Sequence, residues 1–194
     1  MGCHIVRYNL KETRIEYIKK ESVRLSNFLP DYMSDIINNL DDDKYILGVQ
    51  YDYTNDIQVG ITGSAYRKEN WKRTITREMS EELKLYIFFN RIENKKVFIE
   101  NNKTWFCCSI DVSSTRSSIN QEFKQESKIS NRKKKIGVVV HGTFTQLYDL
   151  LQTNYIEYKP NDDISHIVII SVKWLKQYLE LIKKCTQDYI TINY

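Results

Sequence analysis

Residues 63–85 read G-S-A-Y-R-K-E-N-W-K-R-T-I-T-R-E-M-S-E-E-L-K-L, and this stretch carries a helix signal of its own. Asn70 is a good N-cap residue, because its side-chain oxygen can accept hydrogen bonds from the free N–H groups of a helix's first turn. We therefore predict a helix that begins near Trp71 and ends near Leu83.

Three glutamates fall on one face of this predicted helix. Glu78, Glu81 and Glu82 stand at positions i, i+3 and i+4, so their carboxylates are expected to converge. At an effective dielectric of about 20 and a separation of about 6 Å, each pair repels by roughly 3 kcal/mol. A cation among them would relieve this repulsion, and hard carboxylate oxygens suit Mg²⁺ or Mn²⁺. The alternative is a solvated acidic helix face.

Two further residues complete the constellation. Arg77 lies beside Glu78 and four residues before Glu81, where a charge-assisted hydrogen bond can fix a carboxylate. Glu69 precedes the helix in the loop, from which it could reach the same metal ions or tie the loop to Arg77. Taken together, the residues favour a metal site over a solvated helix face.

The stretch resembles the signature of the Nudix hydrolases. That signature is Gly, five residues, Glu, seven residues, Arg-Glu, an apolar residue, any residue, Glu-Glu, any residue, Gly and a final apolar residue. Eight of its nine defined positions match, namely Gly63, Glu69, Arg77, Glu78, Met79, Glu81, Glu82 and Leu85. The departure is Lys84, where the family carries glycine, so the helix exit is expected to differ in shape. No carboxylate is lost, and we expect an intact site.

The resemblance implies an α/β Nudix fold, in which a mixed β-sheet is sandwiched between α-helices. It also implies Mg²⁺- or Mn²⁺-dependent hydrolysis of a nucleoside diphosphate linked to another group, with water attacking a phosphorus atom. By the same resemblance, Glu78 and Glu82 would be the principal metal ligands and Glu81 an additional one. Arg77 would orient Glu78.

The general base varies in position within this family and often comes from a loop after the signature. Glu122 and Glu126 lie in such a segment, one helical turn apart, and Glu122 is the first choice. Glutamates that bind a metal have their pKa held low by the cation, so a separate carboxylate is better suited to take a proton from water. The remaining choice is Glu78 or Glu81 within the helix.

Strands alternate with amphipathic helices along the rest of the chain. The predicted strands are residues 4–8, 44–53, 56–62, 86–92, 97–100, 104–112, 135–140 and 164–172. Predicted helices, besides the glutamate helix, are residues 35–40 and two segments with apolar stripes, Phe144-Leu147-Tyr148-Leu151 and Trp174-Leu175-Tyr178-Leu179-Ile182. A helix and a hairpin fit residues 12–28 equally well. The alternation by itself predicts an α/β layered domain.

Length and composition agree with a single domain over residues 1–194, with an N-terminal elaboration (about 1–43) and a polar, basic insertion (about 113–135). Of 194 residues, 41% are hydrophobic, enough for a sizeable core without staples. The four cysteines form no CxxC pair, which indicates a reduced, intracellular protein without structural zinc. No long apolar run or signal peptide is present, so we expect a soluble, cytoplasmic protein. Abundant Asn, Lys, Ile and Tyr suggest an AT-rich genome, such as that of a protist or a large DNA virus.

Basic and aromatic residues bear on the substrate. Lys133, Lys134 and Lys135 end a basic run that could follow phosphates, although a solvated loop would look the same. Tyr66, Trp71 and Trp105 could stack on a base or a cap, or could pack in the core. With the net charge of +4, these features favour a capped RNA whose 5′ cap is removed, in the host cytoplasm if the protein is viral. The alternatives are a small-molecule pyrophosphatase, acting on dinucleoside polyphosphates, oxidised nucleotides or diphosphoinositol phosphates, and a non-catalytic cap- or nucleotide-binding module.

Overall fold

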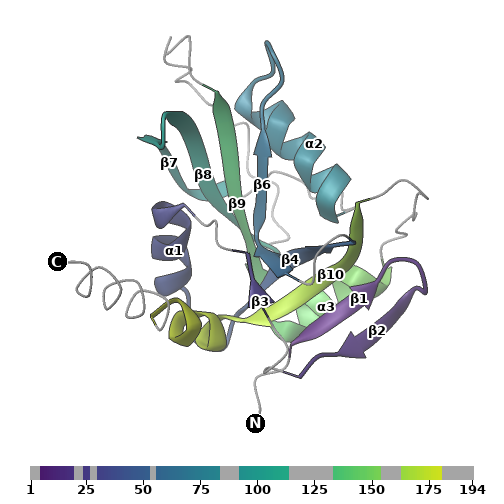
Figure 1. Ribbon diagram of the computed structural model, residues 1–194. Coiled ribbons are helices and arrows are strands. Elements are labelled where there is room, and N and C mark those ends of the chain that lie inside the picture. Colours follow the sequence, from purple (N-terminus) through teal and green to yellow (C-terminus); the bar gives the residue numbers. More distant parts are fainter. Residues whose placement is uncertain are drawn as a thin grey trace, which may run out of the picture.

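A mixed sheet of ten strands forms the centre of the computed structural model of this chain (Figure 1). The structure describes residues 5–19, 24–26, 30–52, 56–83, 92–113, 133–153 and 163–180. The strands are β1 (Val6–Asn9), β2 (Arg14–Tyr17), β3 (Arg24–Leu25), β4 (Tyr45–Tyr51), β5 (Asp56–Val59), β6 (Ile61–Ser64), β7 (Ile92–Glu100), β8 (Lys103–Asp111), β9 (Lys134–Gly142) and β10 (Ile164–Ser171). The helices are α1 (Asp31–Asn38), α2 (Trp71–Leu83) and α3 (Phe144–Thr153), with a further helical segment over 172–180.

Most strand pairs are antiparallel. Along its main path the sheet runs β2-β1-β10-β4-β9-β8-β7, in which only the β8–β9 pair is parallel. Off this path, β5 pairs with β4 and, in parallel, with β3, while β6 pairs with β9. The sheet is therefore mixed but largely antiparallel.

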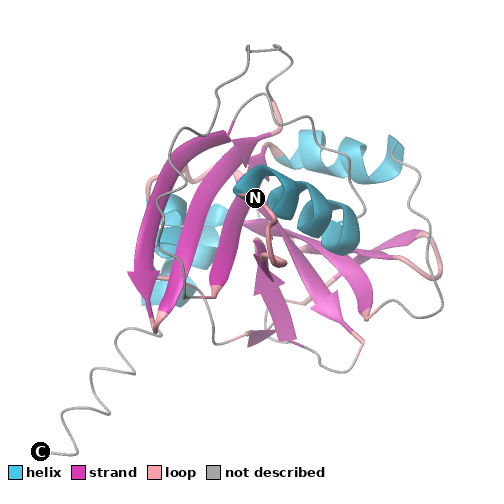
Figure 2. Cartoon of the chain, turned by 90° about the horizontal axis from the view of Figure 1, so that it is seen from above, coloured by secondary structure: helices cyan, strands magenta, loops and turns pink. Residues whose placement is uncertain are grey.

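Helices cover both faces of the sheet, so its central strands are buried on both sides, whereas the edge strand β7 is largely exposed (Figure 2). Apolar side chains of α2 and α3 belong to one buried cluster, and those of α1 and the 172–180 helix belong to another. Successive strand residues alternate between the two clusters. In β9, for example, Ile136, Val138 and Val140 face the α2 side while Val139 faces the α1 side. This three-layer arrangement agrees with the predicted α/β class.

The sheet opens between β4 and β9. These two strands pair only at Tyr45 with Gly142 and at Ile46 with His141. Beyond that point, β5 takes its place beside β4, and β6 takes its place beside β9. Gly60 joins β5 to β6 with a φ of +67°, and a Cβ there would stand 2.6 Å from the carbonyl oxygen of Val138. A sharp bend at a glycine thus divides what the sequence predicted as one strand, 56–62.

The bounds of several other predicted elements differ in the structure. The hairpin alternative holds for the start of 12–28, because β2 pairs with β1 in antiparallel fashion. Helix α1 begins at Asp31, four residues earlier than predicted, directly after Pro30, whose fixed φ suits a helix start. The 97–100 strand is longer, since β7 begins at Ile92. Residues 86–91 of another predicted strand lie outside the described residues.

The predicted polar insertion (113–135) ends earlier than expected at its C-terminal end. Lys134 and Lys135 belong to β9, and Thr104 donates its N–H to the carbonyl of Lys133 at 3.0 Å, so the three lysines stand at the start of a strand. Residues 114–132 of the insertion lie outside the described residues.

Two adjacent cysteines test the alternation of β8. Cys107 belongs to the α1-side cluster and Cys108 to the α2-side cluster, so they face opposite sides of the strand, as predicted. Both are buried free thiols.

No helix among the described residues is long and apolar enough to cross a membrane.

We expect Gly60→Ala to destabilise the protein by about 2 kcal/mol, since alanine disfavours a positive φ and its Cβ would press on the Val138 carbonyl. Urea denaturation measures this. Gly60→Asn separates the two causes, because asparagine tolerates the left-handed region but brings the same Cβ. A wild-type midpoint for both variants would contradict the role given to this bend.

Candidate functional site

Helix α2 begins at the residue that the sequence predicted. The side-chain oxygen of Asn70 accepts a hydrogen bond from the N–H of Arg73 at 2.9 Å, which caps the first turn. The helix starts at Trp71 and is described to Leu83. Lys84, the departure from the signature, lies outside the described residues.

The buried face of α2 contains two carboxylates. Its buried residues are Trp71, Thr74, Ile75, Glu78, Met79, Glu82 and Leu83, which follow one helical stripe. Glu78 and Glu82 therefore occupy positions where an apolar residue would normally pack. Glu81, by contrast, has a side chain that is 54% exposed. The three glutamates share one side of the helix, but only two of them point into the protein.

Arg77 is the centre of the polar network. Its Nε donates to Glu69 at 3.0 Å, and its Nη1 donates to Glu78 at 2.8 Å and to Glu81 at 3.1 Å. Its Nη2 donates to the carbonyl of Ser64 at 2.7 Å and to Glu69 at 3.0 Å. A guanidinium has five N–H groups, and these five bonds use all of them. Arg77 thus holds its neighbours in place and keeps no donor for a ligand.

Glu69 fastens the loop between β6 and α2. Its Oε2 accepts from the N–H of Tyr66 at 2.9 Å, from the hydroxyl of Thr74 at 3.0 Å and from Nη2 of Arg77, while its Oε1 accepts from Nε of Arg77. The hydrogen bonds from Arg77 are the main reason that the pKa of Glu69 is lowered to about 2. Of the two roles predicted for Glu69, these contacts match the loop tie and not the metal ligand.

Glu78 lies directly against β6 at Gly63. A Cβ on Gly63 would stand 2.0 Å from the carboxylate carbon of Glu78, so only glycine leaves room for this side chain. Burial raises the pKa of Glu78, and the positive charge of Arg77 opposes that rise. The signature glycine and the first glutamate of the helix are thereby parts of one contact.

Glu82 is the more deeply buried carboxylate. Its oxygens accept one hydrogen bond from the hydroxyl of Tyr51, at 3.0 Å, and one from the amide of Gln58, at 3.2 Å. Both donors are neutral, and no Lys or Arg of the described residues pairs with this carboxylate. Burial, followed by the negative charge of Glu78, raises the pKa of Glu82 to about 8.

Of the four glutamates, only Glu82 has no cationic partner among the described residues. Among the described residues, no group of three or more His, Cys, Asp or Glu side chains is arranged to hold a metal ion. Arg77 instead supplies positive charge to Glu69, Glu78 and Glu81. Glu82 has only neutral donors, and a buried carboxylate in that position is stabilised by a cation. Hard oxygen atoms of this kind suit Mg²⁺ or Mn²⁺.

The predicted stacking residues separate into two kinds. Trp71 is 5% exposed and stacks on Phe106 with ring centroids 5.3 Å apart, and Trp105 is fully buried. Both tryptophans are core residues, which is the packing alternative that the sequence left open, and their buried rings are not available to stack on a substrate. Tyr66 is 63% exposed and stays available for that role.

The basic and acidic candidates after the signature are only partly described. Lys134 places its ammonium group 5.5 Å from the centroid of the Trp71 ring, and Lys135 lies beside Ser64 in the β6–β9 pair. The start of β9 thus adjoins the start of α2. Glu122 and Glu126 lie outside the described residues, so the general base stays a prediction.

Sequence reasoning missed the partners of Glu82. Tyr51 ends β4 and Gln58 stands in β5, and their distance in the chain from α2 gave no reason to connect them. One signal was available: Gln58 interrupts the apolar pair Ile57 and Val59, and a polar residue in a buried strand usually has a polar partner.

Comparisons with protein-family models, with curated proteins and with solved structures found no match. The fold and the site therefore define a class only in structural terms. The protein is an α/β protein with a largely antiparallel mixed sheet, in which an arginine-centred cluster of glutamates joins one helix to the open part of the sheet.

The lowered pKa of Glu69 predicts how acid affects stability. Because the folded-state pKa is about 2 against an ordinary 4.5, the stabilisation is complete above pH 4.5 and is lost as pH falls towards 2. We expect Glu69→Gln to unfold at lower urea than wild type at neutral pH, with the difference shrinking below pH 4.5. A difference in unfolding free energy between the two proteins that stays constant down to about pH 2 would contradict this.

Proposed function

We propose that the protein is a Mg²⁺- or Mn²⁺-dependent pyrophosphohydrolase that cleaves a nucleoside diphosphate linkage, with removal of the 5′ cap from RNA as its activity. The observation that carries the proposal is the pair of buried carboxylates, Glu78 and Glu82, on the inner face of α2. A folded protein gains nothing in stability from two close carboxylates in its interior. Such a pair is typical of a site that binds a cation.

Glu78 and Glu82 are the residues that would hold the metal. Glu78 is seated against Gly63, and Glu82 is oriented by Tyr51 and Gln58, so both carboxylates are held before any ligand arrives. Glu81 stands at the exposed rim, where it can add a ligand. A bound divalent ion supplies charge neutralisation for phosphate oxygens and lowers the pKa of a water ligand.

Arg77 acts through Glu78 as a positioning residue. Its bonds to Ser64 and Glu69 fix the guanidinium, and its Nη1 then fixes one oxygen of Glu78 at 2.8 Å. Since all five N–H groups are used, Arg77 does not serve as a direct phosphate ligand in this arrangement. Glu122 or Glu126 is proposed as the general base, because a carboxylate outside the cation cluster is the better proton acceptor.

A panel of substrates tests the activity. The protein is incubated with Mg²⁺ or Mn²⁺ and cap-labelled RNA, free cap dinucleotide, nucleoside triphosphates, dinucleoside polyphosphates or diphosphoinositol phosphates. Release of the capped nucleoside diphosphate from RNA supports the proposal. Turnover of only the small molecules would replace the RNA substrate with a small one, and cap binding without any turnover would indicate a binding module.

The metal assignment is tested by Glu82→Gln, with the melting temperature as a readout independent of activity. Saturating Mn²⁺ should raise the melting temperature of the wild type by about 5 °C, while the variant should show no shift and no turnover. In EDTA the variant should be at least as stable as the wild type. The reason is that an amide can still bond with Tyr51 and Gln58, whereas burial raises the pKa of Glu82 to about 8 and so holds this carboxyl protonated at neutral pH at a cost in stability.

Two further variants accompany that measurement, one as a control and one as a second test of the site. Glu16→Gln alters a carboxylate of β2 that pairs with Arg7, away from the site, and should keep the full Mn²⁺ shift. Gly63→Ala should lose the shift with only a modest loss of stability, because the added methyl group displaces the flexible end of Glu78. A normal Mn²⁺ shift in both Glu82→Gln and Gly63→Ala would exclude this metal site.

A further inference from the structure

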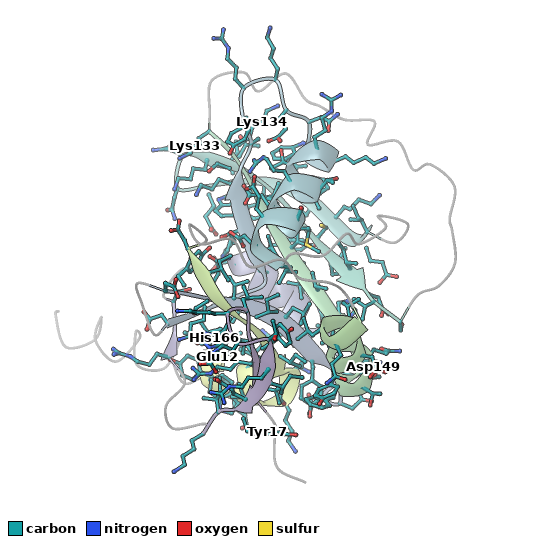
Figure 3. All side chains as sticks on the ribbon, turned by 90° about the vertical axis from the view of Figure 1, so that its right-hand side faces the viewer. Glu12, Tyr17, Lys133, Lys134, Asp149 and His166 are labelled. Carbon is teal, nitrogen blue, oxygen red and sulfur yellow. The ribbon has the colours of Figure 1, made fainter. Side chains whose placement is uncertain are left out.

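One end of the molecule gathers positive charge around the loop between β6 and α2. The exposed basic residues there are Arg67, Lys68, Lys72, Arg73 and Lys133. The loop and the start of β9 lie together, because Ala65 donates its N–H to the carbonyl of Lys134 at 3.0 Å. We call this surface, with Lys134 and Tyr66, the basic end. Figure 3 shows Lys133 and Lys134 at one end of the molecule and Tyr17 and Asp149 towards the other.

The charges of the basic end are not neutralised within the described part of the chain. No ion pair joins Arg67, Lys72 or Arg73 to a described carboxylate. The carboxylate nearest in sequence, Glu69, is already bound twice by Arg77. Exposed cations without acidic partners raise the local concentration of polyanions and favour phosphate chains.

Tyr66 adds an aromatic surface to this charge. One face of its ring covers the guanidinium of Arg77, with Cζ 3.8 Å from the ring centroid, yet the residue as a whole is 63% exposed. The backbone N–H of Tyr66 is bonded to Glu69, which also fixes the loop. A ring that is already held in place loses little freedom when a base stacks on its open side, so stacking there is favoured.

We propose that the basic end binds single-stranded RNA, with one base stacked on the open side of Tyr66 and phosphates along Arg67, Lys72 and Arg73. Single strands fit better than duplexes, since only an unpaired base can lie flat on an exposed ring. The inference rests on the proposed function for its substrate, because the same loop carries Glu69 and leads directly into the glutamate helix. It adds the residues that would recognise the chain beyond the cleaved linkage.

Binding is measured in EDTA, so that the result does not depend on cleavage. The probe is a 3′-fluorescein-labelled, unstructured RNA of about 12 nucleotides, within the usual span of such surfaces. Fluorescence anisotropy is followed over a series of salt concentrations for the wild type, Tyr66→Leu, Tyr66→Phe and Lys72→Glu/Arg73→Glu. The double charge reversal suits the fold, because acidic residues in a helix's first turn interact favourably with its dipole.

The two kinds of variant should differ in how salt affects them. Tyr66→Leu should weaken binding about 10-fold without changing the log–log salt slope, since it removes stacking and no charge. Tyr66→Phe keeps the ring and should bind like the wild type. Lys72→Glu/Arg73→Glu should reduce the slope by about one unit for each phosphate that the variant no longer binds. Tyr17→Leu and Lys11→Glu, on β2 and the turn before it, are the matched controls and should bind normally.

Defined results would overturn the inference. Wild-type affinity of Tyr66→Leu, with its melting temperature measured in parallel, would mean that Tyr66 only shields Arg77. Equal weakening by the control variants would mean that RNA binds through net charge alone. Equal affinity of the wild type for duplex RNA would exclude base stacking. If RNA binds as expected in EDTA but no substrate is cleaved with Mn²⁺, the proposed function fails while the surface stands.

Discussion

The guanidinium of Arg77 is a single polar group that bonds to three successive parts of the chain at once. It bonds to the end of β6 through Ser64, to the following loop through Glu69, and to its own helix through Glu78 and Glu81. Each part contributes an acceptor, and all five donors are satisfied. The apolar stripe of α2 packs the helix on the sheet, and Arg77 adds the polar contacts that fix the loop and the carboxylate of Glu78. Its hydrogen bonds to these carboxylates raise the pKa of Arg77, so its charge is permanent.

The glutamates of α2 come at a cost in packing. Glu78 and Glu82 stand in the same stripe as Ile75, Met79 and Leu83, where apolar side chains would bury more surface and need no partners. Each glutamate has specific contacts with the sheet. Glu78 fills the space above Gly63, and Glu82 accepts hydrogen bonds from Tyr51 and Gln58. Residues on three strands are therefore committed to keeping two carboxyl groups inside the protein, a pattern typical of functional sites and not of stable cores.

The predictable parts of this structure are those governed by local rules. Asn70 marks the start of α2, and the pattern of apolar residues locates most of the strands. Local rules could not show that Glu81 points outward while Glu82 points in, because a helical face has an inside only once a sheet lies under it. The bend at Gly60 was missed for a related reason: its positive φ is imposed by the pairing of β5 and β6 with different strands. The burial of Trp71 also depends on Phe106, and the sequence gives no sign that these two distant residues stack on each other.

The order of the strands also has a consequence for how the chain comes together. β4 lies between β10 and β9, and β1 lies on the far side of β10, so strands from the first third of the chain pair with one from its last fifth. Such pairings close long loops of chain before other contacts offset the lost entropy, and proteins dominated by them fold in milliseconds to seconds. During synthesis, β4 gains β9 only after residue 142 has left the ribosome, and β10 only after residue 171. For most of that time the apolar residues of β4 lack these neighbours. Exposed apolar strands of this kind favour aggregation, so the newly made chain is a natural client of chaperones.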